Sequence, residues 1–598
     1  MTSLEILQHY WGYTHFRPPQ EEIIQAVLDK RDVLAILPTG GGKSICFQVP
    51  VLMQEGICLV ITPLIALMQD QVKQLKQRGI AAVSVHAGMH HREIDITLDN
   101  CVFGKIKFLY LSPERLQTDL FRERVKRMNV CLVAIDEAHC ISQWGYDFRP
   151  PYLQIAELRE VKPDVPFIAL TATATSVVKE DIISKLNLSN PALFQKSFAR
   201  ENLSFVVRKT ETKEKKLLEV LRKVPGSAII YVRSRKSTAS LAAFLNKNKI
   251  SSTFYHAGLT HQDRISRQEE WISNQSRVMV ATNAFGMGID KPDVRVVVHM
   301  DLPENLESYY QEAGRAGRDG KRSYAAIIFH EVDVLSLQNK VLQSQPEIDY
   351  LKKIYQAVAN HFQVAEGSSQ GESYDFDLDG FCKKFLFKST DVYPALKKLE
   401  EFGLLDFNES FYRPSLLHFT FDKKKLYEFQ IAHERFDLLI KALLRLYGGE
   451  LYSDFTPVSE NQIALMMKQS VSTIKLELGQ LNNLQVLVYE PVNESPKITF
   501  VLPRQDADRL PIDRKEFDRR RTLHLSKMEA MKSYVEQNHR CRMQVIQEYF
   551  DEITYATCEI CDVCISKRKT ENLAMLKDYE QQILYLLKQK PMTVEELE

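Results

Sequence analysis

PTGGGKS (Pro38–Ser44) directly follows the apolar run DVLAIL (Asp32–Leu37), and DEAH (Asp136–His139) directly follows a second apolar run, VCLVAI (Val130–Ile135). A buried strand that opens through a Gly-rich turn into a helix directs backbone N–H groups toward a phosphate. A second strand that ends in carboxylates can complete a metal site beside that turn. The two stretches therefore predict an α/β domain that binds a nucleoside triphosphate.

Each residue of the Gly-rich turn has an expected role. Those that wrap the phosphates, meet the β/γ oxygens or ligate Mg²⁺ are Thr39, Gly40, Gly41, Gly42, Lys43 and Ser44. We expect Asp136 to complete the Mg²⁺ site and Glu137 to take a proton from the attacking water. The turn departs from G-x-x-x-x-G-K-[ST], because Leu37 occupies the place of the first glycine. Either motif alone is compatible with an ordinary turn, but the ordered pair predicts a nucleoside triphosphatase.

A basic signature follows far downstream. The stretch QEAGRAGRDG (Gln311–Gly320) contains Arg315 and Arg318. If this stretch is helical, the spacing of three residues places both guanidinium groups on one face, where they can reach a γ-phosphate. Because the arginines lie far along the chain from Lys43, we expect them on a second domain that closes on the nucleotide. The alternative is a surface helix with solvated charges.

Two related halves are indicated by an internal echo. VSVHAGM (Val83–Met89) and TFYHAGLT (Thr253–Thr260) both read as a strand that runs into His-Ala-Gly. Apolar strands alternate with amphipathic helices in both halves, which predicts parallel sheets with helices on both faces.

The ordered motifs resemble a superfamily 2 helicase of the RecQ type. The stretches that carry this resemblance are GYTHFRPPQEEII (Gly12–Ile24), DEAHCISQWGYDFRPPY (Asp136–Tyr152), TATAT (Thr171–Thr175), ATNAFGMGIDKPDVR (Ala281–Arg295) and QEAGRAGRDG. The resemblance runs over about residues 1–345 and resumes near the C-terminus.

The resemblance implies a role for several of these residues. Tyr13 and Arg17 would sandwich adenine while Gln20 reads its edge, which makes ATP the fuel. The residues expected to link hydrolysis to lobe closure and strand contact are His139, Thr171, Thr173 and Gln311. The family activity is ATP-driven 3′→5′ unwinding of DNA in repair, recombination and replication.

Aromatic residues interleaved with arginine follow DEAH directly. In CISQWGYDFR (Cys140–Arg149) the aromatic side chains alternate with polar residues, a pattern that fits neither a buried strand nor a helical stripe. Such a segment suits stacking on unpaired bases. We expect the DNA-sensing residues to be Gln143, Trp144, Phe148 and Arg149; plain packing between lobes is the alternative.

Composition adds little to these motifs. The 598 residues are enough for about four domains, and the net charge of +1 excludes a global cationic field. A nucleic-acid path must then be a local groove whose affinity falls with salt. With no signal peptide or spanning apolar stretch, we expect a soluble, cytoplasmic and nucleoid-associated protein without a membrane partner.

Four of the ten cysteines gather within 24 residues as C-x₁₆-C-x₂-C-x₂-C. These are Cys541, Cys558, Cys561 and Cys564. Their spacing predicts a tetrahedral Cys₄ site for structural Zn²⁺; an iron–sulfur cluster is the competing reading. The stretch CRMQVIQEYFDE (Cys541–Glu552) resembles the RecQ zinc module, which favours zinc. The other six cysteines are expected to be small buried hydrophobic residues.

About 170 residues separate the second lobe from the zinc module, whereas in the family the module ordinarily follows that lobe almost at once. Two stretches of this insert share the order helix, turn and strand: Ser389–Phe407 before LLHFTFD, and Ser470–Glu490 before PKITFVLP. Their apolar positions match at an offset of 82 residues, Leu396, Leu399, Phe402 and Leu405 against Leu478, Leu481, Leu484 and Leu487. We expect a tandem pair of winged helices. Candidate phosphate contacts at the two helix starts are Lys388, Ser389 and Thr390, with Lys468, Ser470, Ser472 and Lys475. A spacer or protein-docking role is equally open.

The predicted fold is α/β, with two RecA-like parallel-sheet lobes followed by winged-helix-like α+β domains and a helical Cys₄ module. The expected segments are a first lobe that binds ATP (1–205), a second lobe (206–345), two winged-helix-like domains (346–430 and 431–518), the zinc-binding module (519–570) and the start of a further domain, cut short (571–598). The expected substrate is single-stranded and forked duplex DNA, with single-strand-binding or repair proteins as partners. Two other classes stay open, an RNA-directed or purely translocating ATPase and a non-enzymatic DNA-binding scaffold.

Overall fold

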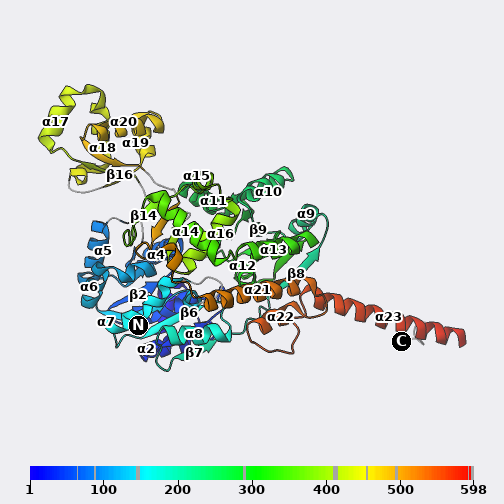
Figure 1. The fold of residues 1–598 in the computed structure, drawn as a ribbon. Coiled ribbons are helices and arrows are strands. Elements are labelled where there is room, and N and C mark those ends of the chain that lie inside the picture. Colours follow the sequence, from blue (N-terminus) through cyan, green and yellow to red (C-terminus); the bar gives the residue numbers. More distant parts are fainter. Residues whose placement is uncertain are drawn as a thin grey trace. The chain divides into compact units, whose positions relative to one another are not determined.

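The alternating strands and helices form two parallel sheets in the computed structural model (Figure 1). The structure describes residues 1–63, 65–86, 89, 91–142, 149–286, 291–408, 415–452, 456–491, 496–589 and 592–593. The chain divides into two compact units, one made of Met1–Asn360, Lys388–Leu404 and Gln505–Glu598, the other of His361–Phe387 and Leu405–Arg504.

The first lobe is built on a seven-stranded sheet in the order β3-β4-β2-β5-β6-β1-β7. Its strands are β1 (Val33–Ile36), β2 (Ile57–Ile61), β3 (Ala82–Val85), β4 (Phe108–Leu111), β5 (Val130–Ile135), β6 (Phe167–Thr171) and β7 (Ala192–Gln195). Its helices are α1 (Ser3–Trp11), α2 (Gln20–Leu28), α3 (Lys43–Leu52), α4 (Ile65–Gln77), α5 (His91–Phe103), α6 (Asp119–Arg127), α7 (Leu158–Val161) and α8 (Ser176–Lys185).

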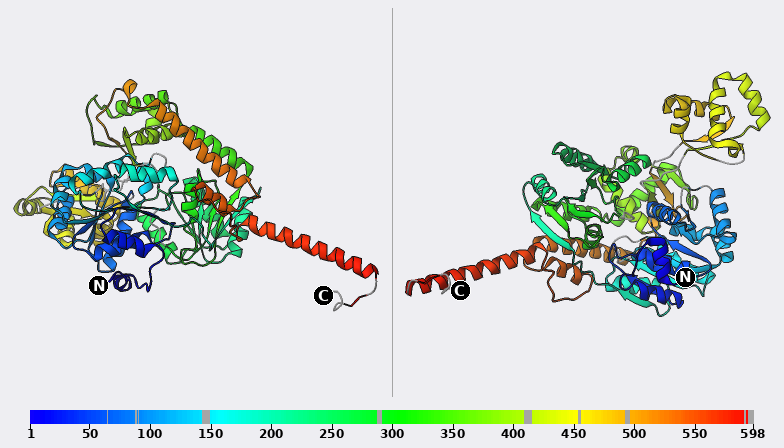
Figure 2. Two further views of the ribbon diagram at one scale, coloured as in Figure 1. Left: turned by 90° about the horizontal axis from the view of Figure 1, so that it is seen from below. Right: turned by 180° about the vertical axis from the view of Figure 1, so that it is seen from behind.

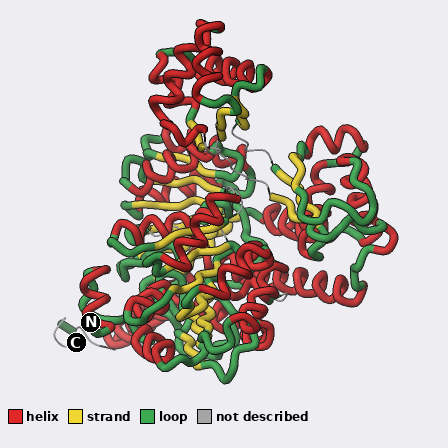
Figure 3. Tube along the Cα trace, turned by 90° about the vertical axis from the view of Figure 1, so that its left-hand side faces the viewer, coloured by secondary structure: helices red, strands yellow, loops and turns green. Residues whose placement is uncertain are grey.

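Helices cover both faces of this sheet, as Figure 3 shows. Alternate residues of β1 point to opposite faces. Val33 and Ala35 join a core with residues of α2, α3 and α4, whereas Leu34 and Ile36 join a core with residues of α5, α6 and α8. Burial on both faces explains why the strand sequence is continuously apolar. It also brings the carboxyl ends of β1, β5 and β6, which are neighbours in the sheet, to one edge.

The second lobe repeats the design on a six-stranded parallel sheet, β10-β11-β9-β12-β13-β8. Its strands are β8 (Leu203–Lys209), β9 (Ser227–Tyr231), β10 (Ser252–Tyr255), β11 (Val278–Ala281), β12 (Val294–His299) and β13 (Ser323–Phe329). Its helices are α9 (Lys213–Lys223), α10 (Arg235–Lys247), α11 (His261–Ile272), α12 (Leu306–Ala313) and α13 (Glu331–Gln343). The predicted pair of parallel-sheet lobes is confirmed.

The C-terminal helices are α21 (Arg514–Glu536), α22 (Arg542–Tyr549) and α23 (Asp562–Gln589). The second half of α21, α22 and the start of α23 pack into a core shared with the second lobe. A buried ion pair joins Lys527 of α21 to Glu307 of α12 at 2.8 Å. Asp562 accepts a hydrogen bond from the backbone N–H of Val207 in β8 at 3.0 Å and pairs with Arg542 at 3.1 Å. Figure 2 shows α23 as one continuous helix. Among the described residues, no helix has the length and apolar character needed to cross a bilayer.

The insert contains α14 (Ile348–Phe362), α15 (Leu378–Phe385), α16 (Ser389–Glu401), α17 (Lys423–Ala432), α18 (Asp437–Tyr447), α19 (Glu460–Met467) and α20 (Val471–Asn483). The 82-residue repeat is visible in its backbone. Leu386 and Lys468, which are 82 residues apart, both adopt the left-handed conformation between two helices. The same hydrogen bond crosses each turn: Phe387 N–H donates to Cys382 and Gln469 N–H to Ala464.

The strands of the insert pair differently from the sequential tandem that the sequence predicts. They are β14 (Ser373–Asp375), β15 (Leu405–Asn408), β16 (Ser415–Phe419), β17 (Thr456–Val458), β18 (Leu487–Glu490) and β19 (Lys497–Phe500). β16, which we assigned to the first copy, pairs with β17 and β18, and β19, which we assigned to the second, pairs with β14 and β15. Each sheet therefore takes one strand from the other copy.

The likeness of the two strands explains why the sequence did not reveal the exchange. In β16 the side chains of Leu417 and Phe419 are buried, and in β19 those of Ile498 and Phe500 are buried. Their registers are equivalent, because Phe419 lies opposite Leu487 and Phe500 lies opposite Leu405. A period of two fixes which face of a strand is buried, but it does not select between two partners that offer the same face.

Candidate nucleotide and metal sites

The phosphate loop (Pro38–Ser44) joins β1 to α3, as predicted. Gly40 and Gly42 have φ values of +78° and +75°, and Gly42 is the cap that precedes α3. A Cβ atom on Gly42 would lie 2.3 Å from Gln20 Nε2, so a side chain at this position would displace Gln20 from the loop, and the positive φ would strain any residue other than glycine. Lys43 opens α3, and the helix N-terminus with its free N–H groups favours an anion.

Two side chains, Arg17 just before α2 and Gln20 at its first position, bind the carbonyl groups of this loop. Gln20 Nε2 donates to the carbonyls of Gly41 and Gly42, each at 3.2 Å. Arg17 Nη1 donates to the Gly40 carbonyl at 2.9 Å, while the Arg17 N–H donates to Gln20 Oε1 at 2.9 Å. Tyr13 is 55 % exposed. Thus Arg17 and Gln20 support the loop backbone directly, a contact that the sequence analysis did not foresee.

The acidic pair lies at the end of β5, opposite the loop lysine. Asp136 and Glu137 are both buried, and Lys43 Nζ is 4.0 Å from Glu137 Oε1. Gln71 Nε2 approaches Asp136 Oδ2 at 3.5 Å. Burial, followed by the charge of Glu137, raises the pKa of Asp136 to about 6, while Lys43 acts in the opposite direction. Such a crowded, buried carboxylate is suited to a cation.

A short polar chain leads from Glu137 to the end of β6. His139 Nδ1 lies 3.4 Å from Glu137 Oε2 and 2.9 Å from Thr171 Oγ1. The Thr171 hydroxyl donates to the Thr173 carbonyl at 3.2 Å. The sequence reasoning missed Tyr152, whose hydroxyl donates to the Asp136 carbonyl at 3.0 Å; its position at the end of the DEAH segment was the available signal. Gln311, in contrast, is buried on α12 of the second lobe.

The two arginines of the second lobe do not share one face. The expected helix ends early, because α12 stops at Ala313 and Gly317 has a φ of +65°. Arg315 turns into its own lobe, where its guanidinium donates to the Gly286 carbonyl. Arg318 instead lies against the phosphate loop, since a Cβ atom on Gly40 would be 3.0 Å from Arg318 Cγ.

Of the predicted DNA sensors, Gln143, Trp144 and Phe148 lie outside the described residues. Arg149 is described, and its Nη1 donates to the Pro63 carbonyl at 2.9 Å. At the helix starts of the insert, the predicted phosphate contacts are all exposed: Lys388, Ser389, Thr390, Lys468, Ser470, Ser472 and Lys475. Ser470 caps α20 by accepting a hydrogen bond from the Thr473 N–H at 3.1 Å.

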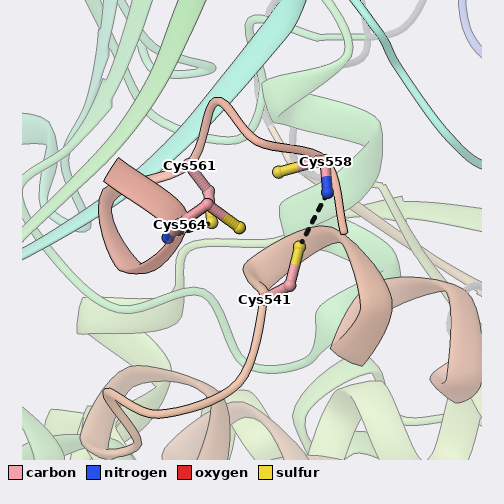
Figure 4. A group of neighbouring side chains, drawn as sticks. All are labelled: Cys541, Cys558, Cys561 and Cys564. Carbon is pink, nitrogen blue, oxygen red and sulfur yellow. Dashed lines mark hydrogen bonds between the residues drawn. The ribbon is translucent and has the colours of Figure 1, made fainter. Parts of the chain in front are cut away.

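The four clustered cysteines converge on one point, as Figure 4 shows. Their sulfur atoms all lie within 4.8 Å of one another. Two backbone groups also donate to these sulfurs: the Cys558 N–H to Cys541 Sγ at 3.3 Å and the Cys564 N–H to Cys561 Sγ at 3.4 Å. N–H donors favour the thiolate form that a metal needs. The spacing prediction of one four-cysteine site is confirmed.

Four family models match the chain in order. They are "DEAD/DEAH box helicase" over residues 17–181, "Helicase conserved C-terminal domain" over 212–320, "RecQ helicase winged-helix domain, Bacteroidota" over 417–491 and "RecQ zinc-binding" over 504–565. The winged-helix range begins in β16 and runs through β18, whose strands share one sheet in the structure. The zinc-binding range includes all four cysteines and supports zinc over an iron–sulfur cluster.

Known helicases match somewhat less than three fifths of the chain. The ATP-dependent DNA helicases RecQ of Haemophilus influenzae and Bacillus subtilis are 42% and 44% identical, over 58% and 59% of this chain and 56% and 61% of their own lengths. The probable ATP-dependent DNA helicase RecS of Bacillus subtilis is 42% identical over 58% of this chain, and 70% of its length is covered. The chain belongs to the RecQ family of superfamily 2 helicases, and the predicted resemblance is confirmed.

Proposed function

We propose that this chain is an ATP-driven DNA helicase that moves 3′→5′ along one strand and separates duplex DNA. The chain spans about three fifths of the length of the RecQ relatives. The observation that carries the proposal is the position of Arg318, a residue of the second lobe, against Gly40 in the phosphate loop of the first. A charge placed there can respond to the γ-phosphate and draw the lobes together.

Lys43, Ser44 and Asp136 would hold the Mg²⁺–triphosphate group. The donor set fits, because Asp136 is a buried carboxylate with a raised pKa beside the loop, and because the buried Thr39 hydroxyl has no hydrogen-bond partner among the described residues. When bound, Mg²⁺ would neutralise charge on the phosphate oxygens. Thr39, Gly40, Gly41 and Gly42 would enclose those oxygens.

Glu137 would take the proton of the attacking water. As the water oxygen bonds to the γ-phosphorus, the bond from that phosphorus to the bridging oxygen breaks and ADP leaves with the electron pair. Arg318, assisted by Arg315 from within its lobe, would stabilise the charge that develops. The hydrogen-bonded chain of His139, Thr171 and Thr173 would couple ATP hydrolysis at Glu137 to the contact with the DNA strand. Gln311 would couple the state of the nucleotide to closure of the lobes.

The base and the DNA strand have their own candidate residues. Tyr13 and Arg17 would enclose adenine, with Gln20 exchanging a bond to the loop for one to the base edge. Gln143, Trp144, Phe148 and Arg149 would sense single-stranded DNA. The exposed N-terminal residues of α16 and α20 in the insert would contact DNA phosphates. The winged helices would then bind duplex or forked DNA. The protein would act on chromosomal DNA at the nucleoid, together with single-strand-binding or repair proteins.

An unwinding assay on forked, 3′-tailed and 5′-tailed duplexes tests the function and the polarity together. We expect ATP-dependent separation of the forked and 3′-tailed substrates, and no separation by the Lys43→Ala variant. Full strand separation by that variant would favour a DNA-binding scaffold. ATP turnover stimulated by single-stranded RNA but not DNA would assign the motor to RNA instead.

A further inference from the structure

Arg200 lies in the connector between the lobes, the segment 196–202 that joins β7 to β8. Its guanidinium binds backbone carbonyls of two chain segments that are far apart in the sequence. Nη1 donates to the carbonyl of Thr39 in the phosphate loop at 3.2 Å. Nη2 donates at 3.1 Å to the carbonyl of Ala316, in the turn that carries Arg318. Longer contacts reach the carbonyls of Gly314 at 3.5 Å and Gly317 at 3.4 Å.

This arrangement uses properties that only arginine has. A guanidinium is a rigid plane with donors on both outer nitrogens, so one group can bridge two carbonyls at a fixed separation. Burial lowers the pKa of Arg200; Tyr310 opposes this, whereas the like charge of Arg318 adds to it. A buried cation close to a second cation is unfavourable unless hydrogen bonds compensate it. The bridge between the carbonyls supplies that compensation.

The neighbouring Asn202, unlike Arg200, binds carbonyl groups of the second lobe alone. Its Nδ2 donates to the carbonyls of Gly317 at 2.7 Å and Lys321 at 3.0 Å, both in the second lobe. Asn202 therefore shapes the turn that presents Arg318. Arg200 holds the same turn and also reaches the residue next to Gly40, where the side chain of Arg318 lies.

We propose that Arg200 is a positioning residue for ATP hydrolysis. By bridging the carbonyl groups of Thr39 and Ala316, Arg200 sets the distance between Arg318 and the phosphate loop. The inference rests on the proposed ATPase function. Arg200 acts through Arg318, so its loss should slow turnover and leave the binding of nucleotide by the first lobe almost unchanged.

Steady-state ATP turnover by Arg200→Ala, Arg318→Ala and the double variant tests this role. Loss of a charge-assisted bridge predicts a fall in kcat of about 10- to 100-fold in Arg200→Ala, with KM for ATP changed by less than about threefold. Arg200→Lys should recover little, because a single ammonium group cannot span both carbonyls. The control Arg222→Ala removes an exposed arginine of α9 and should keep the wild-type rate.

The double variant decides the mechanism. If Arg200 acts through Arg318, Arg200→Ala changes the kcat of Arg318→Ala by less than about twofold. Losses that multiply in the double variant would overturn the proposal, and so would a rise in KM without a fall in kcat. Arg200→Lys keeps the charge and most of the side chain. A thermal unfolding temperature equal to that of the wild type would show that its fold is intact. No turnover by the wild type would reject the ATPase function itself, which is a separate outcome.

Discussion

Phe550 stacks on Phe198, with ring centroids 4.3 Å apart and ring planes 13° apart. Phe550 follows α22 of the zinc module, and Phe198 belongs to the connector between the lobes. Tyr310 of α12 packs edge-on against Phe550 at 5.4 Å, and its hydroxyl donates to the Phe198 carbonyl at 2.8 Å. The zinc module therefore contacts the connector two residues before Arg200.

Replacing Phe550 with alanine should destabilise the first unit. Its side chain is fully buried, and truncation of a buried phenylalanine costs about 3–5 kcal/mol in unfolding free energy. Denaturant unfolding of the two proteins measures the loss. Tyr555→Ala removes an aromatic side chain that is 94 % exposed and serves as the control. Equal stability of Phe550→Ala and the control would show that the stack contributes no stability.

Glu137→Gln should separate nucleotide binding from hydrolysis. The amide keeps the size of the side chain next to Lys43 but cannot take a proton from water. We expect a fall in kcat of about 10²- to 10⁴-fold. Binding of ATP, followed by equilibrium titration with a fluorescent analogue, should change little. A kcat near the wild-type value would assign the proton transfer to another group.

Asp136 should make the unliganded protein less stable above pH 6. Its pKa in the folded chain is raised to about 6 by burial and by Glu137, above the ordinary value of 3.8. The folded state then holds its proton more tightly, so this stabilising contribution is complete below pH 4 and is lost as the pH rises to about 6.

Asp136→Asn removes this titration and should be more stable than the wild type at pH 7, by on the order of 1–3 kcal/mol, although we expect it to lose ATP turnover. Without Mg²⁺ and nucleotide, the stability difference should grow between pH 4 and 6 and stay constant above. Glu55→Gln, at an exposed acid of the same lobe, should show no such growth. A pH-independent difference between Asp136→Asn and the wild type would contradict the raised pKa.

Local motifs made most of the nucleotide and metal sites predictable. The phosphate loop and Asp136 each directly follow an apolar strand, and the cysteines are spaced as ligands of one metal ion. Each of these features can therefore be recognised from residues that are close together in the sequence. The prediction that Arg315 and Arg318 lie on one face of a helix was wrong. The helix that would have given them a shared face ends at Ala313, and Gly314 and Gly317 form the turn that follows.

Long-range relations were not predictable from spacing. Arg200 stands in no motif that the sequence analysis used, and its partners are backbone carbonyls, which leave no trace in residue types. The strand exchange in the insert was hidden for another reason. β16 and β19 share a pair of buried apolar side chains two residues apart, Leu417 and Phe419 in β16 and Ile498 and Phe500 in β19, so the sequence is consistent with either pairing and only the structure distinguishes them.

Engineered disulfides should distinguish the exchanged pairing from the sequential one. In the structure Asp406 of β15 lies opposite Thr499 of β19, and Val488 of β18 lies opposite His418 of β16. Opposite residues in an antiparallel pair have Cα atoms about 4.5–5.5 Å apart, within disulfide range. We expect Asp406→Cys with Thr499→Cys to crosslink under mild oxidation, and Val488→Cys with His418→Cys to do the same.

The pair Asp406→Cys with His418→Cys is the matched control, because these positions would be opposite only if each copy formed its own hairpin. Mass spectrometry of the digested protein identifies each crosslink, and single-cysteine variants measure the background from the native thiols. A crosslink between positions 406 and 418 in place of 406 and 499 would establish the sequential tandem. Both crosslinks at comparable yield would show two interconverting pairings, which the equivalent registers of Phe419 and Phe500 permit.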